Sequence, residues 1–81
     1  MDDETQYVYV AQYEIYDDYS CRGHDLYMSL EEDKVDLWLA HHTQEYESVD
    51  WLENSEMYFR PLGRYGWEKW YVIARPLDEE L

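Results

Sequence analysis

Net charge is the feature that most constrains this chain. Its 81 residues contain 20 aspartates and glutamates against 6 lysines and arginines, so the formal net charge at pH 7 is −14. Repulsion at this density opposes compaction, and such a chain either stays disordered or balances the repulsion by burying apolar surface. Hydrophobic residues make up 46% of this chain and aromatic residues 19%, whereas acidic disordered tails are poor in aromatics. We therefore expect a folded domain.

The length and the cysteine content limit how that domain is stabilised. Chains near this size bury only about 60–65% of their unfolded surface and are marginal without further help. The single cysteine, Cys21, cannot form an internal disulfide, which points to a reducing compartment. Because no signal-peptide pattern and no long apolar run is present, we expect a cytoplasmic location and no membrane partner. We expect one domain over residues 1–81, with frayed ends at 1–5 and 78–81.

Period-two alternation in the N-terminal third predicts β-structure. Residues 7–16 are β-branched and aromatic, and their odd positions, centred on Ala11, form one apolar face. This pattern predicts a long strand with one face on a core. Residues 17–23 have the composition of a turn, and the short apolar segment 26–28 is a candidate second strand.

A helix is predicted in the middle of the chain. Ser29 and Glu32 match the capping-box pattern, so we expect the helix to span residues 30–42. Leu37 falls on the side away from the core and is expected to be exposed. The stripe that packs on the sheet consists of Val35, Trp38, Leu39 and His42. Residues 43–56 are expected to form an ordered loop with a short helical turn capped by Ser48.

The C-terminal third predicts a β-hairpin. Residues 56–62 and 67–77 flank the sequence Gly-Arg-Tyr-Gly, and two glycines around a short gap favour a tight connection. The second arm carries apolar groups on both faces, which is typical of a central strand that is covered on both sides. We expect Trp38, Trp70 and Tyr71 above all to fill the core. Together these elements predict an α+β fold, a small antiparallel sheet of three or four strands with one main helix packed on one face.

The acidic residues are not spread evenly. Residues 31–56 contain nine acids and one lysine, a net charge of −8, whereas residues 57–77 contain four bases and one acid, a net charge of +3. The molecule is therefore polarised, with its acidity on the predicted helix and loop and a mildly basic hairpin behind them.

Three interpretations of this acidity are open. A run of charge is commonly a solvated face that keeps a protein soluble. Excess acids with few lysines are also typical of salt adaptation, although the aromatic content and the uneven distribution argue against it. The third interpretation is a ligand for a basic surface, because carboxylates can occupy Lys/Arg grooves that normally bind phosphates.

Aromatic residues beside the acids support the third interpretation. Tyr46, Trp51 and Tyr58 border the acidic segment, and Tyr and Trp are enriched at the cores of protein interfaces. The candidate partner-binding residues are Glu31, Glu32, Asp33, Asp36, Leu37, Glu45, Tyr46, Glu47, Asp50, Trp51, Glu53 and Glu56.

In size, acidity, aromatic content and lack of catalytic motifs the chain resembles the small acidic proteins of phages and mobile elements that block host nucleic-acid machinery. These include anti-restriction and anti-CRISPR proteins, inhibitors of uracil-DNA glycosylase and inhibitors of RNA polymerase. The resemblance is one of kind and not of any sequence motif. It implies a binding inhibitor and assigns no residue roles.

Motifs for catalysis or metal binding do not emerge. Cys21-x-x-His24 and the pair His41-His42 lack the spacing of a zinc site, and the chain has no phosphate loop, nucleophile elbow or dinucleotide fingerprint. We expect no cofactor, no metal and no enzymatic activity. Direct binding to nucleic acid is disfavoured, because it requires clustered Lys and Arg.

The sequence thus leads to two hypotheses. In the first, the chain is a stoichiometric inhibitor whose acidic face binds a basic nucleic-acid-binding surface of a host protein or complex. In the second, it is a small acidic accessory or interaction module whose charge serves solubility and whose exposed aromatics bind the partner. A dimer through an exposed sheet edge is compatible with either hypothesis.

Overall fold

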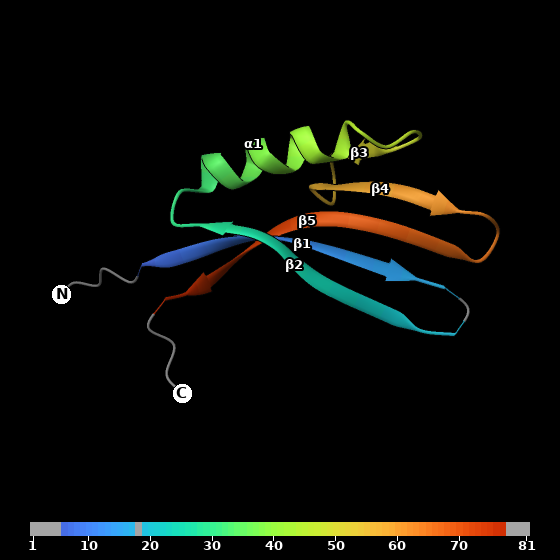
Figure 1. Cartoon of the computed structure of the whole chain (residues 1–81), viewed down its shortest axis with the longest axis horizontal. Coiled ribbons are helices and arrows are strands. Elements are labelled where there is room, and N and C mark those ends of the chain that lie inside the picture. Colours follow the sequence, from blue (N-terminus) through green and yellow to red (C-terminus); the bar gives the residue numbers. More distant parts are fainter. Residues whose placement is uncertain (1–5, 18, 78–81) are drawn as a thin grey trace.

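The protein forms an α+β fold with one helix on one face of an antiparallel sheet, as expected (Figure 1). The computed structural model describes residues 6–17 and 19–77, so the expected fraying at 1–5 and 78–81 lies outside the described residues. The sheet has five strands in the order β2-β1-β5-β4-β3, one more than the upper number expected. The elements are β1 (Tyr7–Tyr16), β2 (Cys21–Ser29), α1 (Glu32–Thr43), β3 (Asp50–Leu52), β4 (Met57–Leu62) and β5 (Gly66–Pro76).

Strands β1 and β5 form the centre of the sheet. They pair antiparallel along their full length, from Tyr7 opposite Pro76 to Tyr16 opposite Trp67. The prediction of a long strand over residues 7–16 is confirmed, and so is the central position of β5 between β1 and β4. The pairing explains why both strands are long, since each supplies the other with a complete hydrogen-bonding ladder.

The core lies between this centre and α1. Ala11, Val35, Leu39 and Trp70 are at most 3% exposed and pack against one another. The predicted helix stripe is therefore correct, with Val35 and Leu39 buried and Trp38 packed against the cluster. Leu37 is 61% exposed on the outer side of α1, as its position in the helix predicts.

The sheet face opposite α1 differs from expectation. Trp67, Lys69 and Tyr71 alternate with the buried Trp70 and so point away from the helix. Among residues 6–17 and 19–77 no helix or second sheet covers them. The prediction that β5 is covered on both sides is therefore wrong, and Tyr71 is half-buried instead of being part of the core under α1.

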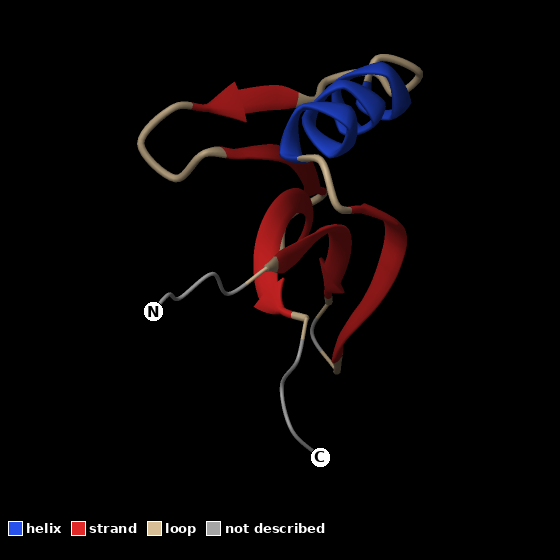
Figure 2. Cartoon of the chain, turned by 90° about the vertical axis from the view of Figure 1, so that its left-hand side faces the viewer, coloured by secondary structure: helices blue, strands red, loops and turns tan. Residues whose placement is uncertain are grey.

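On this open face, neighbouring side chains shield one another. The Lys69 ammonium lies 5.1 Å from the centre of the Trp67 ring and 5.4 Å from that of Tyr71. Towards the other end of the strands, Val10 alternates with Ala11 and yet is fully buried, between its cross-strand neighbours Met28 and Ile73. The long strands are strongly twisted, as Figure 2 shows.

Strand β2 is longer than predicted. Between β1 and β2, the Asp17 carboxylate accepts hydrogen bonds from the backbone amides of Tyr19 and Ser20 at 2.8 and 2.9 Å. The chain then pairs with β1 from Cys21 onward, with a shift of register between Ala11 and Gln12. Turn-like composition was outweighed here by the free edge that β1 offers.

The predicted capping box is wrong. Ser29 is the last residue of β2 and pairs with Tyr9, so it cannot occupy the helix N-cap. Its hydroxyl accepts the backbone amide of Glu31 at 3.1 Å, and Glu31 is the N-cap residue without a side-chain cap. The helix therefore begins two residues later than expected. It extends to Thr43, whose hydroxyl donates to the carbonyls of its own last turn.

The predicted helical turn near Ser48 is also wrong. This segment instead leads into β3, the strand that the sequence pattern did not predict. Ser48 has a left-handed φ of 64°, whereas a helix N-cap is extended. Strand β3 follows at Asp50–Leu52 and pairs with β4, with Trp51 opposite Tyr58. Three residues are too few for an alternating pattern to be visible in the sequence.

The predicted hairpin is confirmed, and its second glycine has a steric role. Strands β4 and β5 are joined by residues 63–65, and Gly63 has a left-handed φ of 69°. A Cβ on Gly66 would lie 2.8 Å from the carbonyl oxygen of Tyr16, closer than such atoms approach in proteins. The glycine thus lets the β1 and β5 backbones meet where the two strands end.

We predict that Gly66→Ala destabilises the fold by about 1–3 kcal/mol, because the added methyl group forces these backbones apart. Gly23→Ala is the matched control, since it is also a strand glycine facing a β1 carbonyl. Its Cβ would lie 3.4 Å from the Tyr13 oxygen, an ordinary contact, and the loss should stay below about 1 kcal/mol. Urea unfolding monitored by tryptophan fluorescence measures both, and equal losses would contradict the steric role.

Candidate functional site

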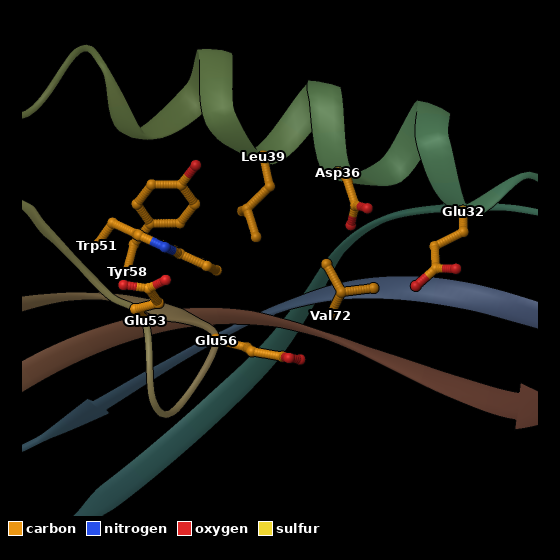
Figure 3. Close-up of a pocket in the computed structure, with 8 residues that line it drawn as sticks. All are labelled: Glu32, Asp36, Leu39, Trp51, Glu53, Glu56, Tyr58 and Val72. Atoms are coloured by element: carbon orange, nitrogen blue, oxygen red, sulfur yellow. The ribbon is translucent and has the colours of Figure 1, made fainter.

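An open groove of about 490 Å³ runs between α1 and the strands on the helix-covered side of the sheet (Figure 3). We call it the acidic groove. Helix α1 forms its upper wall, the β3–β4 hairpin closes one end, and β5 contributes to the base. Its lining residues are Glu32, Asp36, Leu39, Trp51, Glu53, Glu56, Tyr58 and Val72.

Local structure explains how four carboxylates come to line the groove. Glu32, Asp36 and Leu39 are spaced by four and three residues, so they share the lower face of α1 (Figure 3). Glu53 and Glu56 lie in the turn that joins β3 to β4. This turn is held by the amide of Ser55 donating to the Leu52 carbonyl at 3.1 Å and that of Glu56 donating to Glu53 at 3.3 Å.

Two aromatic rings form the closed end of the groove. Trp51 and Tyr58 are cross-strand partners, and their ring centres are 5.0 Å apart at an interplanar angle of 55°. Tyr58 also packs against the core, whereas Trp51 is 51% exposed. An exposed tryptophan on a three-residue strand presents a large apolar surface beside carboxylates.

The groove contains several negatively charged side chains, and no positively charged residue lines it among the described residues. Partial burial raises the pKa of the Asp36 carboxyl above its ordinary value, and the nearby carboxylates of Asp33 and Glu56 raise it further. No lysine or arginine is among the described residues that line the groove. The ion pairs of residues 6–17 and 19–77 lie elsewhere and join Lys34 to Glu31, Arg60 to Glu68, Lys69 to Glu14 and Arg75 to Asp25.

The structure brings together five of the twelve candidate residues, namely Glu32, Asp36, Trp51, Glu53 and Glu56. Asp33 follows the groove residue Glu32 in α1, and its carboxylate raises the pKa of Asp36.

The other candidates lie outside the groove. Glu31 lies at the helix N-cap and is paired with Lys34 at 3.7 Å, and Leu37 points outward. Glu45 and Glu47 are exposed between α1 and β3. Asp50 alternates with Trp51 and so lies on the opposite side of β3.

Most of the Tyr46 ring packs against other side chains of the chain itself. Its ring lies 5.3 Å from Trp70, meets His42 edge-on at 5.5 Å, and carries the Arg60 guanidinium 5.0 Å from its centre. It is 37% exposed, so part of one side remains accessible. Tyr46 therefore connects the acidic loop to the core.

Three groove residues were not among the candidates. Leu39 belongs to the apolar stripe of α1, and Val72 belongs to the helix-facing side of β5, so both read as core in the sequence. Tyr58 borders the acidic segment, but its place opposite Trp51 depends on a strand that the sequence does not reveal. Only the tertiary structure, and no local sequence pattern, identifies these three residues as part of the groove.

Beside the groove, a buried polar network ties three strands together. The Glu68 side chain is 10% exposed and accepts hydrogen bonds from the Tyr13 hydroxyl and from Arg60 Nε, the latter at 2.8 Å. Burial, together with the hydrogen bond to the Glu68 carboxylate, raises the pKa of the Tyr13 hydroxyl far above its ordinary value. The network joins β1, β4 and β5 under Tyr46.

The described residues contain no group of three or more His, Cys, Asp or Glu side chains placed to hold a metal ion. No helix in the part of the chain that the structure describes is long and apolar enough to cross a membrane. Comparison of the chain with protein-family models, with curated proteins and with solved structures finds no match. The fold and the groove therefore define the protein as a small α+β domain with an acidic, aromatic-lined groove, and any role has to be argued from these features.

We predict that Glu68→Gln lowers the free energy of unfolding by about 1–3 kcal/mol, because the neutral amide leaves the largely buried Arg60 guanidinium without its counterion. Glu14→Gln is the control, since Glu14 pairs with Lys69 at 3.2 Å and both side chains are about a quarter exposed. Its loss should be below about 1 kcal/mol. Urea unfolding separates the two variants, and a smaller loss for Glu68→Gln would show that the network is dispensable.

The raised pKa of Asp36 predicts a pH-dependent effect. A carboxyl whose pKa is higher in the folded state favours folding when protonated, and this contribution is lost as the pH rises through the folded pKa. Asp36→Asn should therefore be more stable than the parent at about pH 7, by at most about 0.5 kcal/mol because the group is partly exposed, and should match it at about pH 2.

Thermal unfolding across this pH range, with Glu45→Gln as a control of equal charge, tests the effect. Glu45 is exposed in the loop outside the groove, so its variant should show the smaller gain. An equal gain in both variants would mean that overall charge, and not the groove, sets the difference.

Proposed function

We propose that this chain is a stoichiometric inhibitor that binds a basic, nucleic-acid-binding surface of a host protein or complex in the cytoplasm. In this proposal the acidic face of α1 and the segment up to β4 takes the position of nucleic-acid phosphates, and no reaction is catalysed. The observation that carries the proposal is the concentration of nine acids in residues 31–56 beside a single lysine, which is itself paired with Glu31.

Physical reasoning supports this proposal over a purely solubilising role. Charges that serve only solubility gain nothing from being gathered, because gathering them raises their mutual repulsion. Here the carboxylates of Glu32, Asp36, Glu53 and Glu56 line one groove together with exposed aromatic surface. Complementary charge steers association and selects the partner, while aromatic rings supply contact area at low entropy cost.

A second candidate is an accessory or interaction module that binds through aromatics while its acids serve solubility. The open face of the sheet favours it, because Tyr16 and Trp67 stack there with ring centres 5.3 Å apart and Tyr16 is 38% exposed. In that case the acidic face would contribute little to affinity.

Ionic strength distinguishes the two candidates. After partner capture from a host lysate, we predict that affinity for the purified partner falls at least about tenfold between 50 and 200 mM salt, and that excess nucleic acid displaces the chain. Salt-insensitive binding without competition would overturn the proposal.

A combined variant locates the binding face. Changing Asp33, Asp36, Glu47 and Asp50 together to Asn or Gln should abolish binding and leave the fold intact or more stable, since repulsion is reduced. Circular dichroism serves as the control for folding. Unchanged affinity in this variant would show that these four acids do not form the contact surface.

A further inference from the structure

The acidic groove combines features that select one kind of cation. Its carboxylates enter from two sides, Glu32 and Asp36 from α1, and Glu53 and Glu56 from the β3–β4 turn (Figure 3). The rings of Trp51 and Tyr58 form the closed end of the groove, and the apolar side chains of Leu39 and Val72 also line it (Figure 3). A ligand that fills this space has to be positively charged and to tolerate apolar and aromatic contact.

A metal ion does not fit these features. The groove carboxylates line a volume of about 490 Å³ and do not converge, since no three acidic, His or Cys side chains of the described residues are grouped for metal binding. Bare divalent cations also require a nearly complete shell of oxygen ligands and gain nothing from aromatic walls.

Arginine fits better than lysine. The guanidinium group is planar and weakly hydrated, stacks on aromatic faces and binds carboxylates through two parallel hydrogen bonds. The lysine ammonium is a compact, strongly hydrated point charge that gains less from apolar walls. The groove offers carboxylates and the half-exposed Trp51 ring side by side, which is the combination that a guanidinium uses.

The chain holds one of its own arginines in the same way. The Arg60 guanidinium binds the Glu68 carboxylate and lies 5.0 Å from the centre of the Tyr46 ring. There the arginine is supplied by the chain itself, and its counterion is buried. In the groove a carboxylate and an aromatic ring are likewise adjacent, but no cation of the described residues lines the space. Burial first, and then the nearby Asp33 and Glu56 carboxylates, raise the pKa of Asp36 there.

We propose that the acidic groove receives an arginine side chain of the partner, with its guanidinium against Trp51 and paired with the carboxylates of Glu53 and Glu56. This inference rests on the proposed function and deepens it, because it names the residue type that the basic surface presents. Arginine is also the residue that nucleic-acid-binding proteins use where planar, bidentate recognition of phosphate is needed.

The test uses the whole chain and two probes, acetylated tri-arginine amide and acetylated tri-lysine amide. The tryptophan indole N–H signals are followed by ¹H–¹⁵N NMR, with Trp51 reporting on the groove and Trp67 on the opposite face. We expect tri-arginine to shift the Trp51 signal and to bind about three- to tenfold more tightly than tri-lysine. Equal affinity of the two probes, or a shift confined to Trp67, would overturn the inference.

Variants make the test specific. Glu53→Gln with Glu56→Gln should weaken tri-arginine binding at least about fivefold. The charge-matched control is Asp17→Asn with Asp25→Asn, since both residues lie outside the groove and outside the candidate face, and it should weaken binding less than about twofold. Trp51→Leu should remove the preference for arginine while leaving weak binding of both peptides. The unchanged positions of the remaining indole signals verify the fold, and equal weakening by the two double variants would contradict the inference.

Failure here and failure of the proposed function are separable. Salt-sensitive, nucleic-acid-competed binding of the partner with no arginine preference at Trp51 overturns only the groove inference. An arginine preference at Trp51 combined with salt-insensitive partner binding overturns the nucleic-acid-mimic function and leaves the groove as an arginine-binding site.

Discussion

In this strongly acidic chain, the arrangement of the central strands depends on the burial of one acidic residue, Glu68. Glu68 lies on the helix-facing side of β5 and is neutralised by Arg60 from β4, with a further hydrogen bond from the Tyr13 hydroxyl of β1. A buried carboxylate without such partners would cost several kcal/mol, so the register of the three central strands has to bring these groups together. The same Arg60 lies over the Tyr46 ring, which packs on Trp70. One ion pair thereby fixes the sheet, the core tryptophan and the start of the acidic loop.

The scarce cations are used to stabilise the sheet. Among the described residues, Arg60, Lys69 and Arg75 on β4 and β5 form ion pairs with Glu68 on β5, Glu14 on β1 and Asp25 on β2. Lys34 is the one lysine or arginine of α1, and it pairs with Glu31 at the exposed N-cap. Neutralisation therefore follows the strands and leaves the groove acids to repel one another. The polarity visible in the sequence, an acidic middle and a mildly basic hairpin, becomes in three dimensions a neutralised sheet with an acidic groove beneath its helix.

Local sequence patterns correctly predicted those elements whose pattern is complete within a short segment of the chain. The period-two alternation of residues 7–16, the helical stripe of Val35 and Leu39 and the glycine-flanked connection at Gly63 all led to the observed elements. The wrong predictions concern residues whose conformation is determined by pairing with a strand that is distant in the sequence. Ser29 fits a capping box but is held in β2 by Tyr9, and β3 exists because Trp51 meets Tyr58 across the sheet. The groove was predictable as an acidic region that includes Trp51. Its shape was not, because Tyr58 and Val72 enter it from strands whose order the sequence does not specify.

The two faces of the sheet offer a partner opposite kinds of surface. On the open face Lys69 lies over the rings of Trp67 and Tyr71, so those aromatics already have a cation from within the chain. On the helix side Trp51 is half-exposed beside carboxylates that have no described counterion. A cationic partner gains more at the second surface, where it relieves repulsion that the folded chain otherwise retains. Since a ligand that binds only the folded state stabilises it, the unrelieved charge of the groove is a cost to the free protein that binding removes. The site that weakens the isolated fold is in this way the site where a basic partner has most to contribute.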